Sequence, residues 1–118
     1  MNPPMIRRGE IYWLRPGTPT GSEQADLRPA LVVQNDVGNS ASPTTIVATI
    51  TSQRRRHSYP FHVRFTSQES GLPEDSVIKC EQIQTVDQAR LGRLLGGLSL
   101  EKMREVDAAL HHSLGLEH

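Results

Sequence analysis

The stretch GSEQADLRPALVVQND, residues 21–36, decides the fold of this 118-residue chain. Its first half is polar, and after Arg28 and Pro29 it changes into the nearly unbroken apolar run Ala30–Gln34. Such a run is typical of a β-strand that is buried on both faces. The turn formers DVGNSASP that follow predict a loop. The chain therefore places a charged side chain, Arg28, where a polar loop meets a buried strand.

Further short runs of β-branched or aromatic residues, separated by turn-rich stretches, predict that most of the chain is β-structure. Phe61, Val63 and Phe65 alternate with His62 and Arg64, so these two polar side chains are expected to face solvent. The stretch TSQESGLPED is predicted to be a loop. Strands are predicted at Glu10–Leu14, Ala30–Gln34, Thr45–Thr51, Phe61–Phe65, Val77–Thr85 and Leu91–Leu98, the last weakened by Gly96 and Gly97.

One helix is predicted near the carboxy end, with Ser99 as its N-cap and Gly115 as its stop. Apolar residues at helical spacing are expected to form a single packed face. They are Leu100, Met103, Val106, Leu110 and Leu114. Many short strands with one amphipathic helix predict a mainly β fold with some α, a small and strongly bent barrel. Its edge strands would be protected by partial closure or by pairing with a second chain.

The composition favours one cytoplasmic domain that does not associate with a membrane. No apolar run approaches the ~20 residues of a spanning helix, and the amino end lacks the apolar core of a secretory signal. The 13 basic and 13 acidic residues cancel, so affinity for nucleic acid must come from a local patch. Cys80 has no partner for a disulfide or a metal pair and is interpreted as a structural thiol. We expect the domain to span residues 1–115 and interpret residues 116–118 as a cloning scar and tag.

Four segments occur in an order and spacing that resembles the MazF/PemK (Kid) toxins of type II toxin–antitoxin systems. They are RGEIYW at 8–13, the stretch at 21–36, TIVATIT at 45–51 and KCEQIQTVD at 79–87, and the resemblance covers residues 8–115. It implies an SH3-like barrel with a C-terminal helix that works as a homodimer. It also implies a sequence-specific, metal-independent endoribonuclease. Such an enzyme cleaves single-stranded RNA, including mRNA, through a 2′,3′-cyclic phosphate and so inhibits translation and growth.

By this resemblance Arg28 and Thr51 match the family's catalytic arginine and threonine. Attack by a 2′-hydroxyl builds negative charge on the phosphate in the transition state, and a guanidinium can grip two phosphate oxygens. A guanidinium has a pKa above ~12 and is a poor general base at neutral pH. We therefore expect Arg28 to act as an electrostatic stabiliser, with Glu23 as the candidate base. Without the resemblance, Arg28 would be interpreted as an ordinary surface charge.

Side chains that read RNA bases are predicted at Ser22, Glu23, Gln24, Glu81 and Gln82. Carboxylates and carboxamides pair with the Watson–Crick edges that unstacked bases expose. The alternative for each of them is a polar loop or an ordinary polar strand face. Some relatives carry a basic residue where this chain has Gln84, so no phosphate contact is carried over to that position. The run QRRRH at 53–57, with Arg54–Arg56, has two interpretations: a binding site for phosphate or a partner, or a solvated loop.

No cofactor and no metal site are predicted, because the histidines show no spacing with acids or cysteine that is typical of a metal site. The implied partners are single-stranded RNA and a cognate antitoxin whose disordered C-terminal segment wraps the groove. Contact with DNA is expected only indirectly, through the antitoxin complex. One alternative is a non-catalytic toxin of the same fold that binds DNA gyrase, but the tryptophan of those toxins lies near the carboxy end and the single Trp13 lies in the first strand. An SH3-like adaptor is a third possibility, for which 4% aromatic residues supply little of the aromatic groove required.

Overall fold

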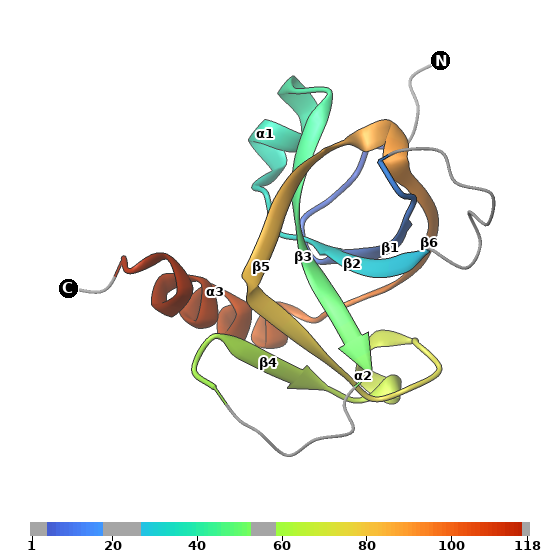
Figure 1. Cartoon of the computed structure of the whole chain (residues 1–118). Helices are drawn as coiled ribbons and strands as arrows, with labels where there is room; N and C mark the ends of the chain where they lie inside the picture. Colours follow the sequence, from blue (N-terminus) through green and yellow to red (C-terminus); the bar gives the residue numbers. More distant parts are fainter. Residues whose placement is uncertain (1–4, 18–26, 53–58, 117–118) are drawn as a thin grey trace.

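A computed structural model of the chain describes residues 5–17, 27–52 and 59–116. These residues form one six-stranded antiparallel sheet with the strand order β4-β5-β3-β2-β1-β6, which curls around on itself (Figure 1). The strands are β1 (Glu10–Leu14), β2 (Arg28–Val32), β3 (Thr44–Ser52), β4 (His62–Phe65), β5 (Ser76–Asp87) and β6 (Leu91–Gly97). The helices are α1 (Asp36–Ala41), α2 (Ser67–Ser70) and α3 (Leu100–Leu114), with a 3-10 turn at Gln88–Arg90. The predicted mainly β fold with a C-terminal helix is confirmed.

The long strand β5 changes direction in its middle. Its register with β3 shifts between Ala48 and Thr49, so residues 80–82 of β5 fall between two sets of pairs and have no partner on β3. Extra residues on one strand bend it and increase its local twist. Figure 1 shows this sharp turn of β5. Below it, β5 also pairs with β4, and above it β5 continues toward β6. The bend thus gives the sheet its curled shape.

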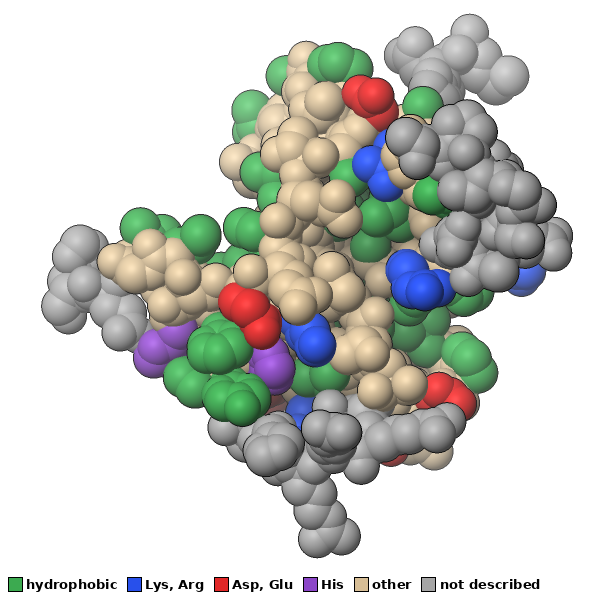
Figure 2. Space-filling model, in the orientation of Figure 1, with side chains coloured by type: hydrophobic (Ala, Val, Ile, Leu, Met, Phe, Trp, Pro, Cys, Tyr) green, Lys and Arg blue, Asp and Glu red, His purple; other side chains and the backbone are tan. Residues whose placement is uncertain are grey.

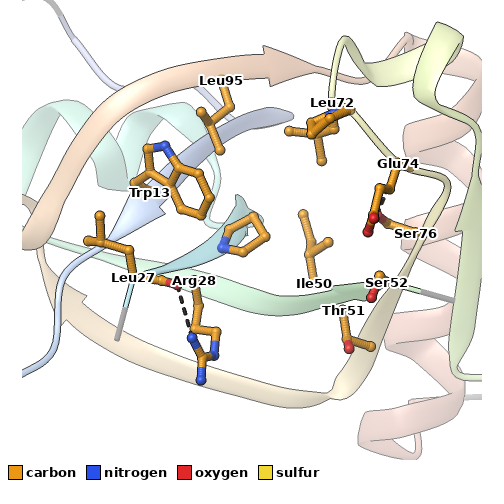
Figure 3. A pocket seen from close by; sticks show the side chains of 12 residues that line it. Trp13, Leu27, Arg28, Ile50, Thr51, Ser52, Leu72, Glu74, Ser76 and Leu95 are labelled. Atoms are coloured by element: carbon orange, nitrogen blue, oxygen red, sulfur yellow. Dashed lines mark hydrogen bonds between the residues drawn. The ribbon is translucent and has the colours of Figure 1, made fainter. Parts of the chain in front are cut away.

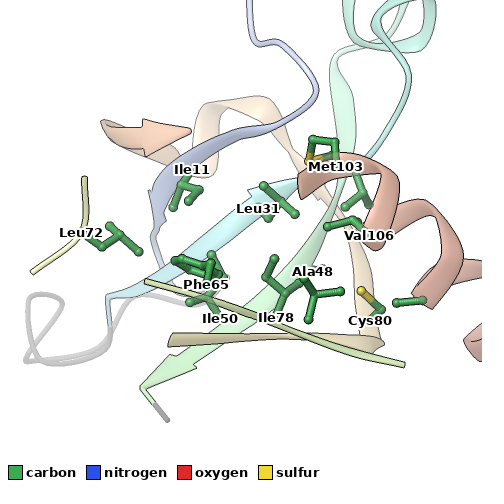
Figure 4. Close-up of a cluster of buried hydrophobic side chains, with 13 residues drawn as sticks. Ile11, Leu31, Ala48, Ile50, Phe65, Leu72, Ile78, Cys80, Met103 and Val106 are labelled. Atoms are coloured by element: carbon green, nitrogen blue, oxygen red, sulfur yellow. The ribbon is translucent and has the colours of Figure 1, made fainter. Parts of the chain in front are cut away.

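Strand β2 is buried on both faces, as the apolar run predicts. Leu31 and Val33 belong to the larger core, which lies between the sheet and α3. Ala30 and Val32 point to the other face and join a second, smaller core. Figure 4 shows the larger core, with Leu31 facing α3. Each fully buried Leu or Val side chain contributes roughly 1.5–3 kcal/mol, so this strand holds the two cores together.

Helix α3 has the predicted caps and covers the larger core. The Ser99 hydroxyl accepts a hydrogen bond from the Lys102 backbone N–H at 3.1 Å, and Gly115 ends the helix in the left-handed conformation with φ 69°. The buried side chains of α3 are Met103, Val106 and Ala109. Helix α3 contacts β4 and β5, so it fixes the lower half of the sheet.

The expectation that Leu100 and Leu114 share the packed face of α3 is wrong. Their side chains are 83% and 52% exposed. At 100° per residue, Leu100 lies about 120° around the helix from the buried Val106, and Leu114 about 80°. The packed stripe is narrower than the apolar pattern suggests, because it is limited to residues that face the sheet. Two leucines are therefore left on the described surface of α3.

Two short helices occupy segments that were predicted to be loops, so that prediction is wrong at both places. In α1, Asn35 is the N-cap and its Oδ1 accepts from the Gly38 backbone N–H at 2.7 Å. In α2, Thr66 and Glu69 form a reciprocal capping box. The residues that form turns also satisfy the free N–H groups at a helix start. A pattern rich in Asn, Asp and Ser therefore does not distinguish a turn from a short capped helix.

Buried hydrogen bonds tie α1 to the upper ends of β2 and β3. Asn39 is 3% exposed, and its Oδ1 accepts from Thr45 Oγ1 at 2.6 Å and from Gln34 Nε2 at 3.0 Å. The backbone carbonyl of Asn39 accepts from Gln88 Nε2 at 2.9 Å. We call Gln34, Asn39, Thr45 and Gln88 the amide cluster. Every buried side-chain N or O within the described ranges has a hydrogen-bond partner, so this end of the structure is fully satisfied.

Gly96 allows β6 to lie directly against α2. A Cβ at this position would stand 1.9 Å from the Ser70 backbone carbonyl oxygen, closer than any real contact. The glycine is therefore required by a close approach of two backbones, and it does not prevent β6 from reaching Gly97. This approach brings Leu95 of β6 and Leu72, which follows α2, to the same cavity.

The limits of the strands differ from the predicted ones by a few residues. Strand β2 begins at Arg28, two residues early, because Arg28 pairs with Leu14 of β1. Strand β5 continues to Asp87 because its upper half pairs with β3 beyond the bend. Phe61 precedes β4, and its ring stacks on Tyr59 at 5.2 Å between centroids.

No helix in the described ranges is both long and apolar enough to span a membrane.

Candidate active site

Arg28 and Thr51 come together at one end of the β2–β3 ladder. The ladder pairs Ala30 with Thr49 and Leu31 with Ala48. Continued by two residues, this register sets Arg28 opposite Thr51, and directly opposite residues of an antiparallel pair point to the same face. Figure 3 shows both side chains leaving the ladder on the same side, away from Ile50. The structure therefore brings the two predicted catalytic residues to the same end of the sheet, at the border of one cavity.

The backbone of Arg28 is fixed and its side chain is exposed. Arg28 pairs with Leu14 of β1, and its Nη1 donates a hydrogen bond to the Leu27 carbonyl at 3.1 Å. The following Pro29 pairs with Trp13, and its ring fixes the backbone angle next to the arginine. A guanidinium carries five N–H donors. The hydrogen bond to Leu27 orients the group, and the planar fork of donors has the geometry that binds a phosphate in bidentate fashion.

Thr51 is held in the interior of the sheet. It is half-buried on β3 and pairs with Val77 of β5, and the next residue, Ser52, pairs with Ser76. A β-branched side chain on a strand has few rotamers. The hydroxyl of Thr51 is thus presented from a backbone position that is fixed by pairing with β5.

A cavity of about 390 Å³ lies at the same end of the ladder. Pro29 and Ile50 belong to its wall, one residue along β2 and β3 from Arg28 and Thr51. Side chains alternate between the two faces of a strand, so Arg28 and Thr51 stand on one face and the apolar wall on the other. The cavity is lined by Trp13, Leu27, Arg28, Pro29, Ile50, Thr51, Ser52, Leu72, Pro73, Glu74, Ser76 and Leu95.

Sequence reasoning missed several residues of this cavity. Trp13 was predicted only as a residue of the first strand, where its position argued against gyrase binding, and Glu74 only as part of a loop. In Figure 3, Trp13 and Leu27 lie on one side of the cavity and Glu74 on the other, close to Ser76, whose Oγ donates to the Glu74 carbonyl at 3.1 Å. The alternation of β1, which puts Trp13 two residues from the buried Ile11, was the signal that could have located Trp13.

Glu81 and Gln82 do not line this cavity. They lie among residues 80–82 of β5, which have no partner on β3, four and five residues along the chain from Val77, the partner of Thr51. Both are exposed, and Glu81 Oε2 lies 2.9 Å from His62 Nε2. His62 is half-buried and lies within pairing distance of Glu81, so the expectation that its side chain is solvated is wrong. Arg64 is exposed, as expected. The predicted role of Glu81 and Gln82 in base recognition stays a prediction.

The same face carries a cation that sequence reasoning did not select. Lys79 of β5 pairs with Thr49 on one side and with His62 on the other. Because Thr49 and Thr51 are two residues apart, Lys79 shares a face with Thr51 and Arg28. Figure 2 shows basic side chains along the middle of this front surface, with acidic ones and a histidine nearby. The local charge pattern is mixed but provides more than one cation for a phosphate backbone.

Cys80 is fully buried, and burial, followed by the nearby charge of Glu81, raises the pKa of its thiol to about 12. A thiol in this state is a poor nucleophile, which supports its interpretation as a structural residue. Among the residues that the structure describes, no three His, Cys, Asp or Glu side chains form a group that could hold a metal ion.

Several predicted residues fall outside the described ranges. Ser22, Glu23 and Gln24 lie between residues 18 and 26, and Arg54–Arg56 lie between residues 53 and 58. Their predicted roles in base recognition, base catalysis and phosphate binding therefore stay predictions.

The chain belongs to the family of PemK-like, MazF-like toxins of type II toxin–antitoxin systems, whose model matches residues 7–114. This match covers β1 to α3, including Arg28, Thr51, Glu81 and Gln82. It confirms the resemblance that the four sequence segments indicate.

Solved structures are similar over nearly the whole chain. An endoribonuclease in complex with its cognate antitoxin from a mycobacterial species is 24% identical, covers 96% of this chain and 98% of its own, and has a TM-score of 0.78. The Mycobacterium tuberculosis toxin MazF-mt6 is 23% identical, with 92% and 99% covered and a TM-score of 0.75. MazF from Deinococcus radiodurans is 25% identical, with 96% and 99% covered and a TM-score of 0.71. The curled sheet with its C-terminal helix is therefore the fold of these toxins.

Proposed function

We propose that this toxin is a sequence-specific endoribonuclease that cleaves single-stranded RNA, mRNA included, and thereby inhibits translation and growth. The single observation that supports this most directly is that Arg28 and Thr51, just beyond the paired end of the β2–β3 ladder, border the same cavity. Family membership and the similarity to structures described as endoribonucleases support it further.

In the proposed reaction, the 2′-hydroxyl of the RNA attacks the adjacent phosphorus, the bond to the 5′-oxygen breaks, and a 2′,3′-cyclic phosphate forms. The negative charge that builds on the phosphate oxygens is stabilised by the Arg28 guanidinium. The Thr51 hydroxyl donates a hydrogen bond to the same phosphate. Glu23 remains the candidate base that takes the proton of the 2′-hydroxyl, and a proton donor must deliver one to the leaving 5′-oxygen.

The proposed reaction needs no metal ion, because the cation that meets the phosphate is supplied by the protein. Purified toxin should therefore cut RNA in excess EDTA. We expect fragments that begin with a 5′-hydroxyl and end in a cyclic phosphate, and sequencing of their ends should give one short motif. Activity that EDTA abolishes and magnesium restores would contradict the metal-independent mechanism, and random cut sites would contradict sequence specificity. Contamination is excluded by an Arg28→Ala sample purified in parallel.

The proposed partners follow the same reasoning. A cognate antitoxin with a disordered C-terminal segment would bind the toxin, and similar structures include complexes with an antitoxin. Contact with DNA would be indirect, through that complex. A homodimer, a cytoplasmic location and a single domain over residues 1–115 stay predictions. The gyrase-binding alternative receives no support from the position of Trp13, which lies in β1 and lines the cavity beside Arg28.

A further inference from the structure

The cavity beside the catalytic pair has two chemically different sides. One side is apolar and includes the Trp13 indole, Leu27 and Leu95 (Figure 3). The other side has hydroxyls from Ser52 and Ser76 and the carboxylate of Glu74. Its volume of about 390 Å³ lies within the range of small-molecule sites, roughly 300–1,000 Å³. A flat apolar surface that faces a few polar groups is suited to a planar ring with a polar edge.

We propose that this cavity binds one unstacked base of the RNA, next to the phosphate that is cut, with Trp13 as the stacking surface and Glu74 as an acceptor at the base edge. This inference rests on the proposed ribonuclease function. Single-stranded RNA offers bases that stack on aromatic side chains and expose their Watson–Crick edges.

The position of the cavity relative to Arg28 and Thr51 supports a nucleotide as its occupant. The two residues border the cavity, and the next residues inward on the same strands, Pro29 and Ile50, form part of its wall. A nucleotide can therefore place its phosphate at the catalytic pair and turn its base around the end of the ladder.

Charge favours a base over an apolar segment of an acidic protein partner. Glu74 is an exposed carboxylate on the cavity wall and would repel the acidic residues of such a segment. A base is neutral, and its phosphate lies toward the cationic Arg28. A carboxylate accepts hydrogen bonds only. The single donor on the uracil edge, N3–H, lies between two carbonyl oxygens that a carboxylate repels, so the cavity should prefer adenine, cytosine or guanine, which carry an exocyclic amino group.

Trp13 is the only tryptophan in the chain, so its fluorescence reports on this cavity alone. The probe is an RNA oligonucleotide that contains the mapped cleavage motif with a 2′-deoxynucleotide at the cut position, which blocks cleavage. Binding of this probe should change the emission of Trp13. In a series that makes each nucleotide near the cut abasic in turn, one position should remove the emission change and weaken binding about 5- to 150-fold.

Two pairs of variants sharpen the test. Trp13→Phe keeps an aromatic face and should bind the probe within about threefold of the parent, whereas Trp13→Leu should bind as weakly as the parent binds the critical abasic probe. Glu74→Gln adds a donor and should let uracil compete at that position, while Glu74→Asp keeps the preference for an amino group. Thermal melting checks that each variant folds, and if Trp13→Leu does not fold, the abasic series on the parent decides.

The outcomes separate this inference from the proposed function. If the parent cuts all-ribose RNA and binds the probe, as measured by anisotropy of a labelled probe, but the Trp13 emission and every abasic position are silent, the cavity assignment is overturned and the ribonuclease function stands. If an acidic, leucine-containing peptide changes the emission and RNA does not, the cavity belongs to a protein partner. If the parent neither cuts nor binds RNA, both proposals fail.

Discussion

The two ends of the β2–β3 ladder differ in how their polar groups are used. At the upper end, the amide cluster of Gln34, Asn39, Thr45 and Gln88 is closed by internal hydrogen bonds, with Asn39 only 3% exposed. At the lower end, Arg28 is exposed and Thr51 half-exposed, beside a cavity. At the upper end of the two strands, the polar groups therefore bond to one another. At the lower end, polar groups face a cavity where they can bind another molecule.

This difference shows how one end of a two-stranded ladder can hold the residues at the other end in a fixed position. Buried polar groups with complete hydrogen bonding rigidify a structure and define one arrangement. The amide cluster and the two cores fix the register of β2 on β3, and this register aligns Arg28 with Thr51. Substitutions at the upper end should therefore change stability, and substitutions at the lower end should change activity.

The largest effect is expected for Arg28→Ala at the lower end. If Arg28 stabilises transition-state charge, its loss raises the barrier by about 3–4 kcal/mol and slows cleavage on the order of 100- to 1,000-fold. The measurement is single-turnover cleavage of RNA that contains the mapped site, with thermal melting alongside. Arg104→Ala, an exposed arginine on α3, is the matched control and should cut normally. A folded Arg28→Ala protein that cuts within about threefold of the parent rules out the catalytic role.

The next effect is expected for Asn39→Ala at the upper end. It removes the acceptor of Thr45 Oγ1 and one of the two acceptors of Gln34 Nε2, and it leaves the buried Thr45 hydroxyl unpaired, which destabilises the fold by about 1–3 kcal/mol. Urea unfolding at fixed protein concentration measures this, and the cleavage rate of the folded fraction should be unchanged. Ser40→Ala, an exposed neighbour in α1, should shift stability by less than about 0.5 kcal/mol. Equal losses for the two variants would contradict the role of the amide cluster.

The sharpest comparison makes the same substitution at both ends of β3. Thr45→Val deletes a buried hydroxyl that is hydrogen-bonded to Asn39 and should lower stability by about 1–3 kcal/mol without slowing cleavage. Thr51→Val deletes the hydroxyl at the active end and should slow cleavage roughly 10-fold, or about 1.4 kcal/mol, with little change in unfolding. Two variants that behave alike in both assays would show that the ends of β3 are not specialised.

The smallest effect is expected for Gln82→Ala, which lies on the exposed surface of β5 away from the cavity. If Gln82 reads a base, its removal should reduce discrimination at one position of the motif about fivefold, close to 1 kcal/mol, and leave the maximal rate nearly intact. Cleavage of a randomised RNA pool followed by sequencing measures this. A motif that remains unchanged would assign Gln82 to the ordinary polar surface.

The sequence predicts the strands well because the pattern of apolar residues along each strand reflects which of its faces are buried. The run of residues 30–33 is apolar without alternation, and its side chains do divide between two cores. The caps of α3 are also local signals, and Ser99 and Gly115 act as predicted. The two short helices were missed because Asn35 and Thr66 belong to residue types that serve turns and helix caps equally.

The candidate site was predictable only in part. The equal spacing of residues 28–30 and 49–51 becomes informative only once β2 and β3 are known to pair, because the side chains meet through tertiary contact. Trp13, Leu72 and Leu95 come from three distant segments, and the close packing of Gly96 on Ser70 that brings two of them together leaves no periodic signal. The resemblance to the toxin family supplied Arg28 and Thr51, but it did not indicate the cavity.

The unpaired residues 80–82 of β5 also have an evolutionary consequence. In a paired strand, the substitution of a side chain changes its contacts with the neighbours on the adjacent strands and so affects stability. Gln82 is exposed and stands outside the pairing with β3, so exchanges there leave the ladder untouched, whereas Glu81 also pairs with His62. If Gln82 takes part in recognition, as proposed, selection for a different RNA sequence or a different antitoxin can act on it without first disturbing the fold. The bend that shapes the sheet would then provide the chain with a place where recognition can diverge while the architecture is inherited unchanged.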